Sequence, residues 1–219
     1  MATDPVVANA LLDLRRAATS LGLPWALIGG QALAARGVPR TTEDADALVP
    51  ESSLRALAQA LTDDFEWTPL RDDASGDYVQ ADGVEVLFMD DPVLFDIGRE
   101  RAMVALESPM GLVVELLAAQ HPIEVEMIEG ATTLEHHDVS VPVAPLGGIL
   151  LVKTKADRTK DVAAIEQTAE HLPRAEINEA VEWAEERDPE NARDLRAIVD
   201  AVRVRRTPKG REHYSRRRK

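Results

Sequence analysis

Residues 25–49 constrain the fold more than any other stretch of the sequence. A short apolar run ends at Gly29 and Gly30 and passes into an alanine-rich segment, and after a turn a second apolar run carries Asp44 and Asp46. Short apolar runs bounded by glycine are typical of buried strands, and strand residues two positions apart point to the same face of a sheet. The stretch therefore predicts a strand–helix–strand unit that presents two carboxylates on one face.

A glycine turn beside two carboxylates has the chemistry of half a metal–triphosphate site. Nucleotidyl transfer places negative charge on phosphate oxygens, so positioning and divalent cations do most of the catalysis. Mg²⁺ prefers oxygen ligands, and backbone N–H groups approach phosphate closely where side chains are absent. Taken singly, Gly29 and Gly30 are also typical of a tight turn, and Asp44 and Asp46 of a solvated strand edge. Their combination favours a site, which needs a third acid on a neighbouring strand.

The remaining sequence predicts an α+β fold, with a mixed sheet in the first two thirds of the chain and helices at its end. The segment 63–76 is polar and rich in turn residues, so we expect a loop there. Trp67 in this segment is interpreted as a packing residue, with stacking on a base as the alternative. The adjacent His136 and His137 are interpreted as structural. Helices are expected at 5–21, 31–36, 53–61, 123–130, 146–172, 174–187 and 190–205, and strands at 25–28, 44–49, within 78–89 and 103–119, and at 139–143.

The composition fits a globular protein of a reducing compartment. Hydrophobic residues make up 45% and charged residues 29% of the 219 residues, and cysteine is absent, which excludes disulfides and thiolate metal sites. No apolar run approaches the roughly 20 residues that span a bilayer, and the N-terminus lacks the layout of a signal peptide. We therefore expect a cytoplasmic protein without a membrane partner.

Basic residues are concentrated at the C-terminus of an otherwise acidic chain. Residues 203–219 contain nine of the 25 Lys and Arg residues and one of the 39 Asp and Glu residues, whereas the net charge of the whole chain is −14. Such a basic, flexible tail predicts contact with tRNA, other RNA or another polyanion. The alternative interpretation is a tail that folds back on its own acidic body.

The opening stretch resembles the signature of the nucleotidyltransferase superfamily. That signature is a glycine turn followed by two aspartates that alternate with hydrophobic residues. More narrowly, the stretch resembles the AbiEii-like nucleotidyltransferases of the abortive-infection toxin type, in which Arg-x-Thr-x-Asp-hydrophobic-Asp follows the Gly-Gly pair. The matching residues are Gly29, Gly30, Arg40, Thr42, Asp44, Ala45 and Asp46, with Ala45 smaller than the usual residue between the aspartates.

A second block of the chain extends the resemblance. The family carries a lysine and then Ala-x-Arg-x-Lys-Asp on a helix after the sheet, and this chain has that order from Lys153 to Asp161. The resemblance implies that Lys153 and Arg158 face the triphosphate and that Asp161 orients one of them. Without the resemblance, the same residues are typical of a solvated helix face with charge pairs.

The resemblance also implies a third acid, for which the sequence offers two candidates. Glu115 lies in an apolar strand, at about the family's distance before the strand that contains Val141. Glu85 has a similar local sequence but lies too far upstream, so we favour Glu115. In this interpretation Asp44, Asp46 and Glu115 hold Mg²⁺ or Mn²⁺, and Glu115 also activates the acceptor hydroxyl.

The implied function is a Mg²⁺-dependent transfer of a nucleoside monophosphate from a nucleoside triphosphate to a hydroxyl of an RNA 3′ end, such as tRNA, or of a protein side chain. Some members of the family are toxins, so a cognate antitoxin is an expected partner. The alternative is a weak or inactive protein of this fold that senses nucleotide or acts like an antitoxin. The implied domains are a nucleotidyltransferase-like domain at 1–165, with its mixed sheet flanked by helices, a C-terminal helical extension at 166–202 and the tail at 203–219.

Overall fold

The computed structural model describes residues 3–40, 42–72, 78–81, 83 and 103–206. The chain divides into two compact units. The sheet unit comprises Met1–Arg36 and Arg40–Ala144, and the helical unit comprises Gly37–Pro39 and Pro145–Lys219.

The boundary between the units lies earlier than residue 165, where the predicted catalytic domain ends. Helix α6 (Leu146–Ala156) begins just after the boundary, and it packs against α7, α8 and α9 of the helical unit. Its apolar residues are thus buried among the C-terminal helices. That residues 145–165 act together with the sheet in catalysis stays a prediction.

Among the described residues, eight strands form one mixed sheet, which confirms the α+β class. Their order is β4-β3-β5-β6-β2-β1-β8-β7. The pairs β1–β8 and β2–β6 are parallel, and the other neighbours are antiparallel. The strands are β1 (Ala26–Ile28), β2 (Asp44–Pro50), β3 (Thr68–Asp72), β4 (Tyr78–Gln80), β5 (Met103–Glu107), β6 (Val113–Ala119), β7 (Thr132–His136) and β8 (Val139–Val143).

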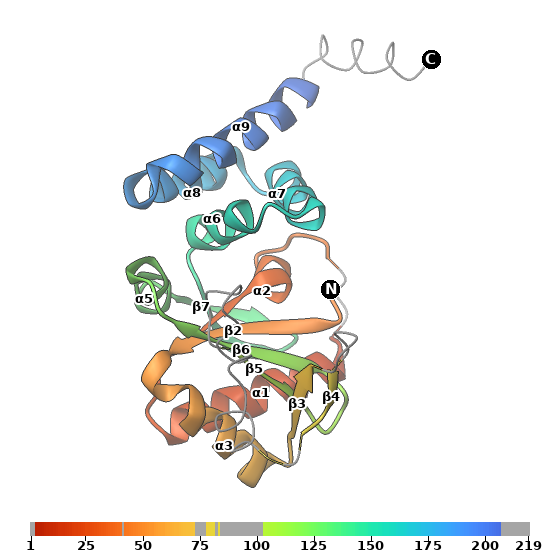
Figure 1. Ribbon diagram of the computed structural model, residues 1–219. Helices are drawn as coiled ribbons and strands as arrows, with labels where there is room; N and C mark the ends of the chain where they lie inside the picture. The colour runs from red at the N-terminus through yellow and green to blue at the C-terminus, as the bar shows by residue number, and fades with distance from the viewer. Residues whose placement is uncertain (1–2, 41, 73–77, 82, 84–102, 207–219) are drawn as a thin grey trace. The chain divides into compact units, whose positions relative to one another are not determined.

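Helices cover both faces of the sheet (Figure 1). Helices α1 (Pro5–Ser20) and α3 (Leu54–Phe65) lie together on one face, and α2 (Gly29–Ala35) lies on the other. Helix α1 begins as its sequence predicts, because the Asp4 side chain accepts a hydrogen bond from the Val6 N–H at 2.9 Å and proline occupies the first helical position. The short 3₁₀ turn η1 (Glu51–Ser53) precedes α3, and α5 (Pro122–Glu129) follows β6.

The structure departs from the predicted elements at three places. Strand β3 lies inside the predicted loop 63–76, because pairing with β5 outweighs a sequence without strand periodicity. Strand β7 was not predicted, and it pairs antiparallel with β8 across a two-residue turn. The single helix expected at 146–172 is two helices, since Asp157 has a left-handed φ of 46°. Glu85 and the second strand expected within 78–89 lie outside the described residues.

Trp67 is a packing residue. It immediately precedes β3 and is 2% exposed, and its indole Nε1 lies 3.5 Å from the Asp13 carboxylate on α1. A side chain so buried is not available to stack on a base, so the alternative interpretation of Trp67 is wrong.

The helical unit contains α6, α7 (Thr159–His171), α8 (Arg174–Arg187) and α9 (Pro189–Arg206). Helices α6 and α8 approach closely at Gly147, where an added Cβ would stand 2.5 Å from the Ala180 carbonyl oxygen. Helix α9 continues to Arg206, so the predicted flexible tail is helical over its first four residues.

Two arginines of that helical end contact acidic and polar side chains of the same unit. Arg203 donates to Asp200 at 3.1 Å and to Asn178, and Arg205 donates to Glu166. These contacts tie the first residues of the 203–219 segment to α7, α8 and α9. Residues 207–219 lie outside the described part of the chain.

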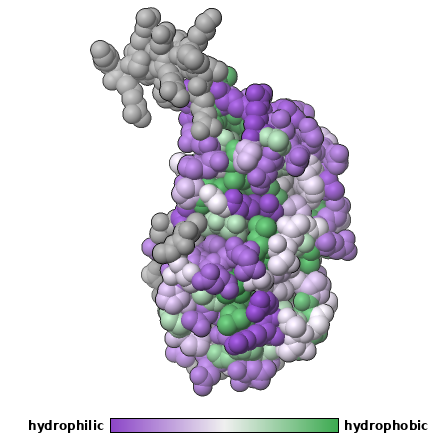
Figure 2. Space-filling view, turned by 180° about the vertical axis from the view of Figure 1, so that it is seen from behind, coloured by the Kyte–Doolittle hydropathy of each residue, from purple (hydrophilic) through white to green (hydrophobic). Residues whose placement is uncertain are grey.

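The described surface has no concentration of large apolar side chains. The large hydrophobic residues that are exposed lie on four different segments: Leu21, Met110, Val125 and Val204. On the face drawn in Figure 2, hydrophilic residues predominate and hydrophobic ones occupy small separate areas. None of the described helices is both long enough and apolar enough to cross a membrane.

Candidate functional site

Strand register places the three predicted acids on one face of the sheet. Asp46 on β2 is the direct partner of Glu115 on β6, and Asp44 is the partner of Val113. Neighbouring strands lie about 4.8 Å apart, and paired residues point to the same face. Asp44 is exposed, Asp46 and Glu115 are half-buried, and Ala45 and its counterpart Val114 are buried on the opposite face.

The Gly29 backbone lies directly against the Asp46 carboxylate. Gly29 has a φ of +65°, and a Cβ added there would stand 1.6 Å from Asp46 Oδ2. Ile28, the preceding residue, pairs with Asp46 across β1 and β2. Gly29 is therefore required both by its left-handed conformation and by the lack of space beside Asp46.

Gly30 makes a different close approach. A Cβ at Gly30 would stand 2.1 Å from the Thr42 Cγ2 methyl group. The sequence predicted that the two glycines let phosphate approach the backbone. The structure shows that the two glycines already make room for Asp46 and Thr42, with Gly29 half-buried and Gly30 buried.

Arg40 has a buried nitrogen that no described group satisfies. Its Nε has no hydrogen-bond partner in the part of the chain that the structure describes. An unsatisfied buried donor costs about 1–3 kcal/mol, and a guanidinium is well suited to carboxylate or phosphate oxygens. Arg40 thus has unused hydrogen-bonding capacity for an anion.

The acids match a divalent cation in donor type and in backbone placement. Carboxylate oxygens on adjacent strands are the ligands that Mg²⁺ and Mn²⁺ prefer. No group of three or more Asp, Glu, His or Cys side chains within the described ranges stands ready to hold a metal ion. Asp46 and Glu115 each take part in other interactions. Like charges repel, so convergence of the three carboxylates requires a cation and a rotation of their side chains.

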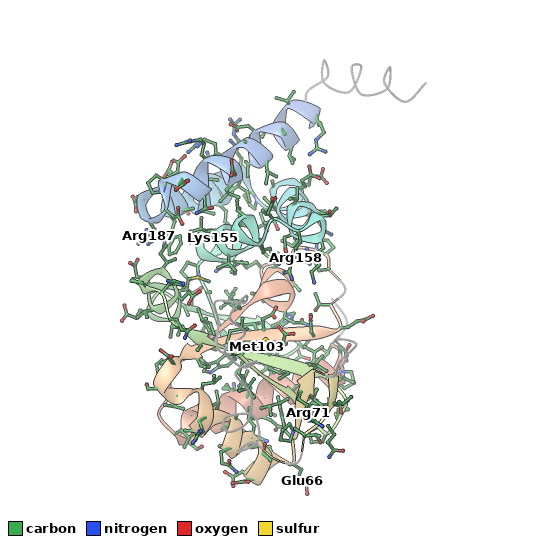
Figure 3. The ribbon with its side chains drawn as sticks, viewed as in Figure 1. Glu66, Arg71, Met103, Lys155, Arg158 and Arg187 are labelled. Carbon is green, nitrogen blue, oxygen red and sulfur yellow. The ribbon has the colours of Figure 1, made fainter. Side chains whose placement is uncertain are left out.

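The second predicted block forms an ion cluster inside the helical unit. Asp161 Oδ1 lies 3.2 Å from Lys153 Nζ, and Asp161 Oδ2 lies 2.6 Å from Arg158 Nε. The chain turns at Asp157 between α6 and α7, and Arg158 lies just before α7 (Figure 3). Lys153 and Arg158 thus both reach Asp161. Asp161 therefore orients both cations, where the resemblance implied one.

Burial and charge act in opposite directions on Asp161, which is 2% exposed. Burial raises the pKa of Asp161, but the hydrogen bond from Arg158 and the charge and hydrogen bond of Lys153 outweigh it and hold the pKa below its usual value. The Lys153 side chain is 13% exposed and that of Arg158 is 61% exposed. Arg158 is thus the member of the cluster that can contact a ligand. Its action together with the acids of the sheet unit stays a prediction.

A buried polar pair beside the glycine turn could not be recognised from the sequence. Gln31 on α2 and His136 on β7 are 4% and 5% exposed, and their side chains meet at 2.8 Å between Oε1 and Nε2. Burial, and then the nearby His137, lower the pKa of His136 from 6.5 to about 4. The sequence signal for this pair was weak, because His136 ends β7, a strand that the sequence did not predict.

No protein-family model matches the sequence, and no curated protein matches it significantly. The chain is similar to solved structures at low identity. An antigenic nucleotidyltransferase-like protein from Paracoccidioides brasiliensis is 18% identical over 91% of this chain and 94% of its own, with a TM-score of 0.49. A putative nucleotidyltransferase from Thermotoga maritima is 14% identical over 78% of this chain and 96% of its own, also with a TM-score of 0.49.

The antibiotic-resistance factor ANT(2″)-Ia is 18% identical over 94% of this chain and 95% of its own, with a TM-score of 0.46. These similarities are distant.

Proposed function

We propose that this chain is a nucleotidyltransferase that depends on Mg²⁺ or Mn²⁺. The observation that carries the proposal is the direct pairing of Asp46 with Glu115 on adjacent strands, with the Gly29 backbone packed against Asp46. This arrangement offers carboxylate ligands for a cation beside the backbone of Gly29, a residue without a side chain.

In this reaction the acceptor oxygen bonds to the α-phosphorus of a nucleoside triphosphate. The bond from that phosphorus to the oxygen bridging to the β-phosphate breaks, and pyrophosphate leaves with the electron pair. Glu115 takes the proton of the acceptor hydroxyl, and Asp44, Asp46 and Glu115 would hold the cation. When bound, the cation neutralises charge that develops on the phosphate oxygens.

The triphosphate is proposed to bind at the turn of Gly29 and Gly30, beside Thr42 and Asp46, and Gly29 is the more exposed of the two glycines. Arg40 supports this placement through its unsatisfied buried Nε. Lys153 and Arg158 are proposed to contribute positive charge, and Arg158 is the more exposed of the two. A cluster of carboxylates needs such cations nearby if it is to accept a polyanionic substrate.

The proposed acceptor is a hydroxyl of an RNA 3′ end, such as tRNA, or of a protein side chain. Residues 207–219 hold six of the chain's Lys and Arg residues, and this segment is proposed to recruit RNA. In the toxin version of this proposal, a cognate antitoxin would bind the chain and block transfer.

The proposal is tested by label transfer. The full chain is incubated with each α-phosphate-labelled nucleoside triphosphate, Mg²⁺, total tRNA and cell extract, and the labelled band identifies nucleotide and acceptor. Asp46→Asn and Glu115→Gln should abolish labelling. Glu107→Gln is the matched control, because Glu107 lies on the same face of the sheet one strand beyond Glu115, outside the proposed ligand set. Labelling that survives Asp46→Asn would contradict the proposal.

The role of the tail is tested separately. Deletion of residues 207–219 leaves all of α9 in place and removes the six basic residues beyond it. Labelling of tRNA should fall while nucleotide binding is unchanged. Unchanged labelling of tRNA would show that the tail does not recruit the acceptor.

A second function, nucleotide binding without turnover, is favoured by one observation. The described residues hold no ready group of three metal-ligating side chains. A nucleotide sensor or antitoxin-like partner would bind a nucleoside triphosphate and transfer nothing. Isothermal titration with each nucleotide and Mg²⁺ distinguishes the two, since binding without labelling of any acceptor would favour this second function.

A further inference from the structure

The Gln31–His136 pair is a buried polar contact between α2 and β7 in the sheet unit. Each side chain is at least nine-tenths buried, and the two meet at 2.8 Å. Because the Gln31 Oε1 atom can only accept a hydrogen bond, His136 Nε2 carries the proton and donates it. Loss of either partner would leave a buried polar group unsatisfied.

The Gln31–His136 hydrogen bond joins β7 to α2, the helix that begins with the glycine turn. Gln31 directly follows Gly29 and Gly30, and α2 contacts β2 on one side and β7 on the other. On the β2 side, Gly29 lies against Asp46 and Gly30 against Thr42, with no space for a methyl group at either position. On the β7 side, the hydrogen bond to His136 holds the first turn of α2, while at the other end of the helix Arg36 donates to the Ala144 carbonyl at 2.7 Å.

Apolar packing alone fixes α2 weakly. The helix has seven residues, GGQALAA, of which Leu33 is the one large apolar side chain. Small side chains make few dispersion contacts, and those contacts do not define a direction. A hydrogen bond does define one, because it weakens steeply when its angle is poor.

We propose that the Gln31–His136 hydrogen bond positions the glycine turn against Asp46 and Thr42, and through that contact sets the affinity for the nucleotide. The proposal rests on the proposed nucleotidyltransferase function. Gln31 and His136 act here as positioning residues, because they hold the turn that touches the substrate. A displacement of about 1 Å at such a turn is enough to weaken a site by up to about 100-fold.

The test compares a broken pair with an apolar pair. Gln31→Met removes the acceptor and leaves the His136 donor buried and unsatisfied, so both the melting temperature and the affinity for nucleotide should fall. Gln31→Met/His136→Leu replaces both partners with apolar groups, which restores stability but does not restore the hydrogen bond that orients α2. We expect this double variant to melt near the wild type while its Kd for a Mg²⁺-bound nucleoside triphosphate stays about 10- to 100-fold higher.

Two further variants complete the design. His136→Gln keeps a side-chain amide that can donate to Gln31, and it should recover most of the affinity that His136→Leu loses. Gln59→Met on α3 is the matched control, because within the described residues Gln59 bonds its neighbour Asp63, on the opposite face of the sheet from α2. A double variant that binds nucleotide as tightly as the wild type overturns the proposal, and so does equal affinity of His136→Gln and His136→Leu.

The outcome is separable from that of the proposed function. A wild-type chain that binds no nucleotide contradicts the function, and the position of the turn is then read from the backbone amide resonances of Gly29 and Gly30. Displaced resonances in the double variant support the positioning role, and unchanged resonances contradict it.

Discussion

Two charged clusters in this protein are built in different ways. Asp46 and Glu115 lie 69 positions apart in the sequence and become neighbours through the pairing of β2 with β6. Lys153, Arg158 and Asp161 lie within nine positions of one another and meet through one chain reversal between two helices. The first cluster depends on register, since a slip of one residue would turn Glu115 to the other face of the sheet. The second depends on local sequence and on one buried carboxylate.

The largest expected difference between the clusters is in catalysis. Asp46→Asn keeps the shape of the side chain and removes its charge, so transfer should fall about 10³-fold or more, because cation binding supplies several kcal/mol. Asp161→Asn, which weakens the orientation of two cations, should reduce transfer about 10-fold. The measurement is the initial rate of label incorporation. If Asp46→Asn and Asp161→Asn lose the same fraction of the transfer rate, the two clusters do not differ in their importance for catalysis.

The next effect concerns the glycine turn. Gly29→Ala places a methyl group on the Asp46 carboxylate and strains a left-handed residue, so the free energy of unfolding should fall by about 3–4 kcal/mol. Gly111→Ala is the matched control, because Gly111 has a φ of +87° with nothing within 4 Å of the added methyl group. It should cost about 1–2 kcal/mol from strain alone. Urea unfolding of both variants measures the difference.

The buried pair of the sheet unit should make stability depend on pH. The pKa of His136 is about 4 in the folded chain, against 6.5 for a solvated histidine, so the unfolded chain binds more protons between these values. Stability is therefore complete above pH 6.5 and should fall by about 3 kcal/mol as the pH drops to 4. Urea unfolding across this range should show the slope in wild type and not in His136→Leu. The exposed His171→Leu should retain it.

The smallest expected effect is the stability carried by the local cluster. Asp161→Ala leaves the largely buried Lys153 ammonium group without a carboxylate partner, so the free energy of unfolding should fall by about 2 kcal/mol. The ion pair of Asp161 with Arg158 adds little to this loss, because the Arg158 side chain is exposed. The lowered pKa of Asp161 means that this contribution is present at neutral pH and is lost as the pH falls below 3.8. Glu186→Gln, at an ion pair with a 73% exposed carboxylate, should cost less than about 0.5 kcal/mol. Urea unfolding at pH 7 compares the two.

Prediction from sequence was most accurate where a local rule applied. Helix α1 follows from Asp4 and Pro5, and α8 has the predicted bounds 174–187. It failed where a distant partner decided the outcome. Strand β3 exists because β5 pairs with it, and α6 ends where Asp157 adopts a left-handed conformation that the charge pattern of the segment does not reveal.

The candidate site divides in the same way. Asp44 and Asp46 were predicted to share a face because alternation along a strand is local. Glu115 was chosen by resemblance, and its place beside Asp46 is a result of the parallel pairing of β2 with β6. The contacts of Gly29 with Asp46 and of Gln31 with His136 could not be predicted, because each joins segments that are distant in the sequence.

The sequence by itself thus determined the α+β class, the glycine turn, the two aspartates on one face and the acidic body with its basic end. Tertiary structure decided that Glu115 lies beside Asp46, that Gly29 and Gly30 pack against Asp46 and Thr42, and that Gln31 and Arg36 join α2 to distant segments. The physical reason is that periodicity and capping act over a few residues, whereas strand register and buried hydrogen bonds depend on segments that only the folded chain brings together.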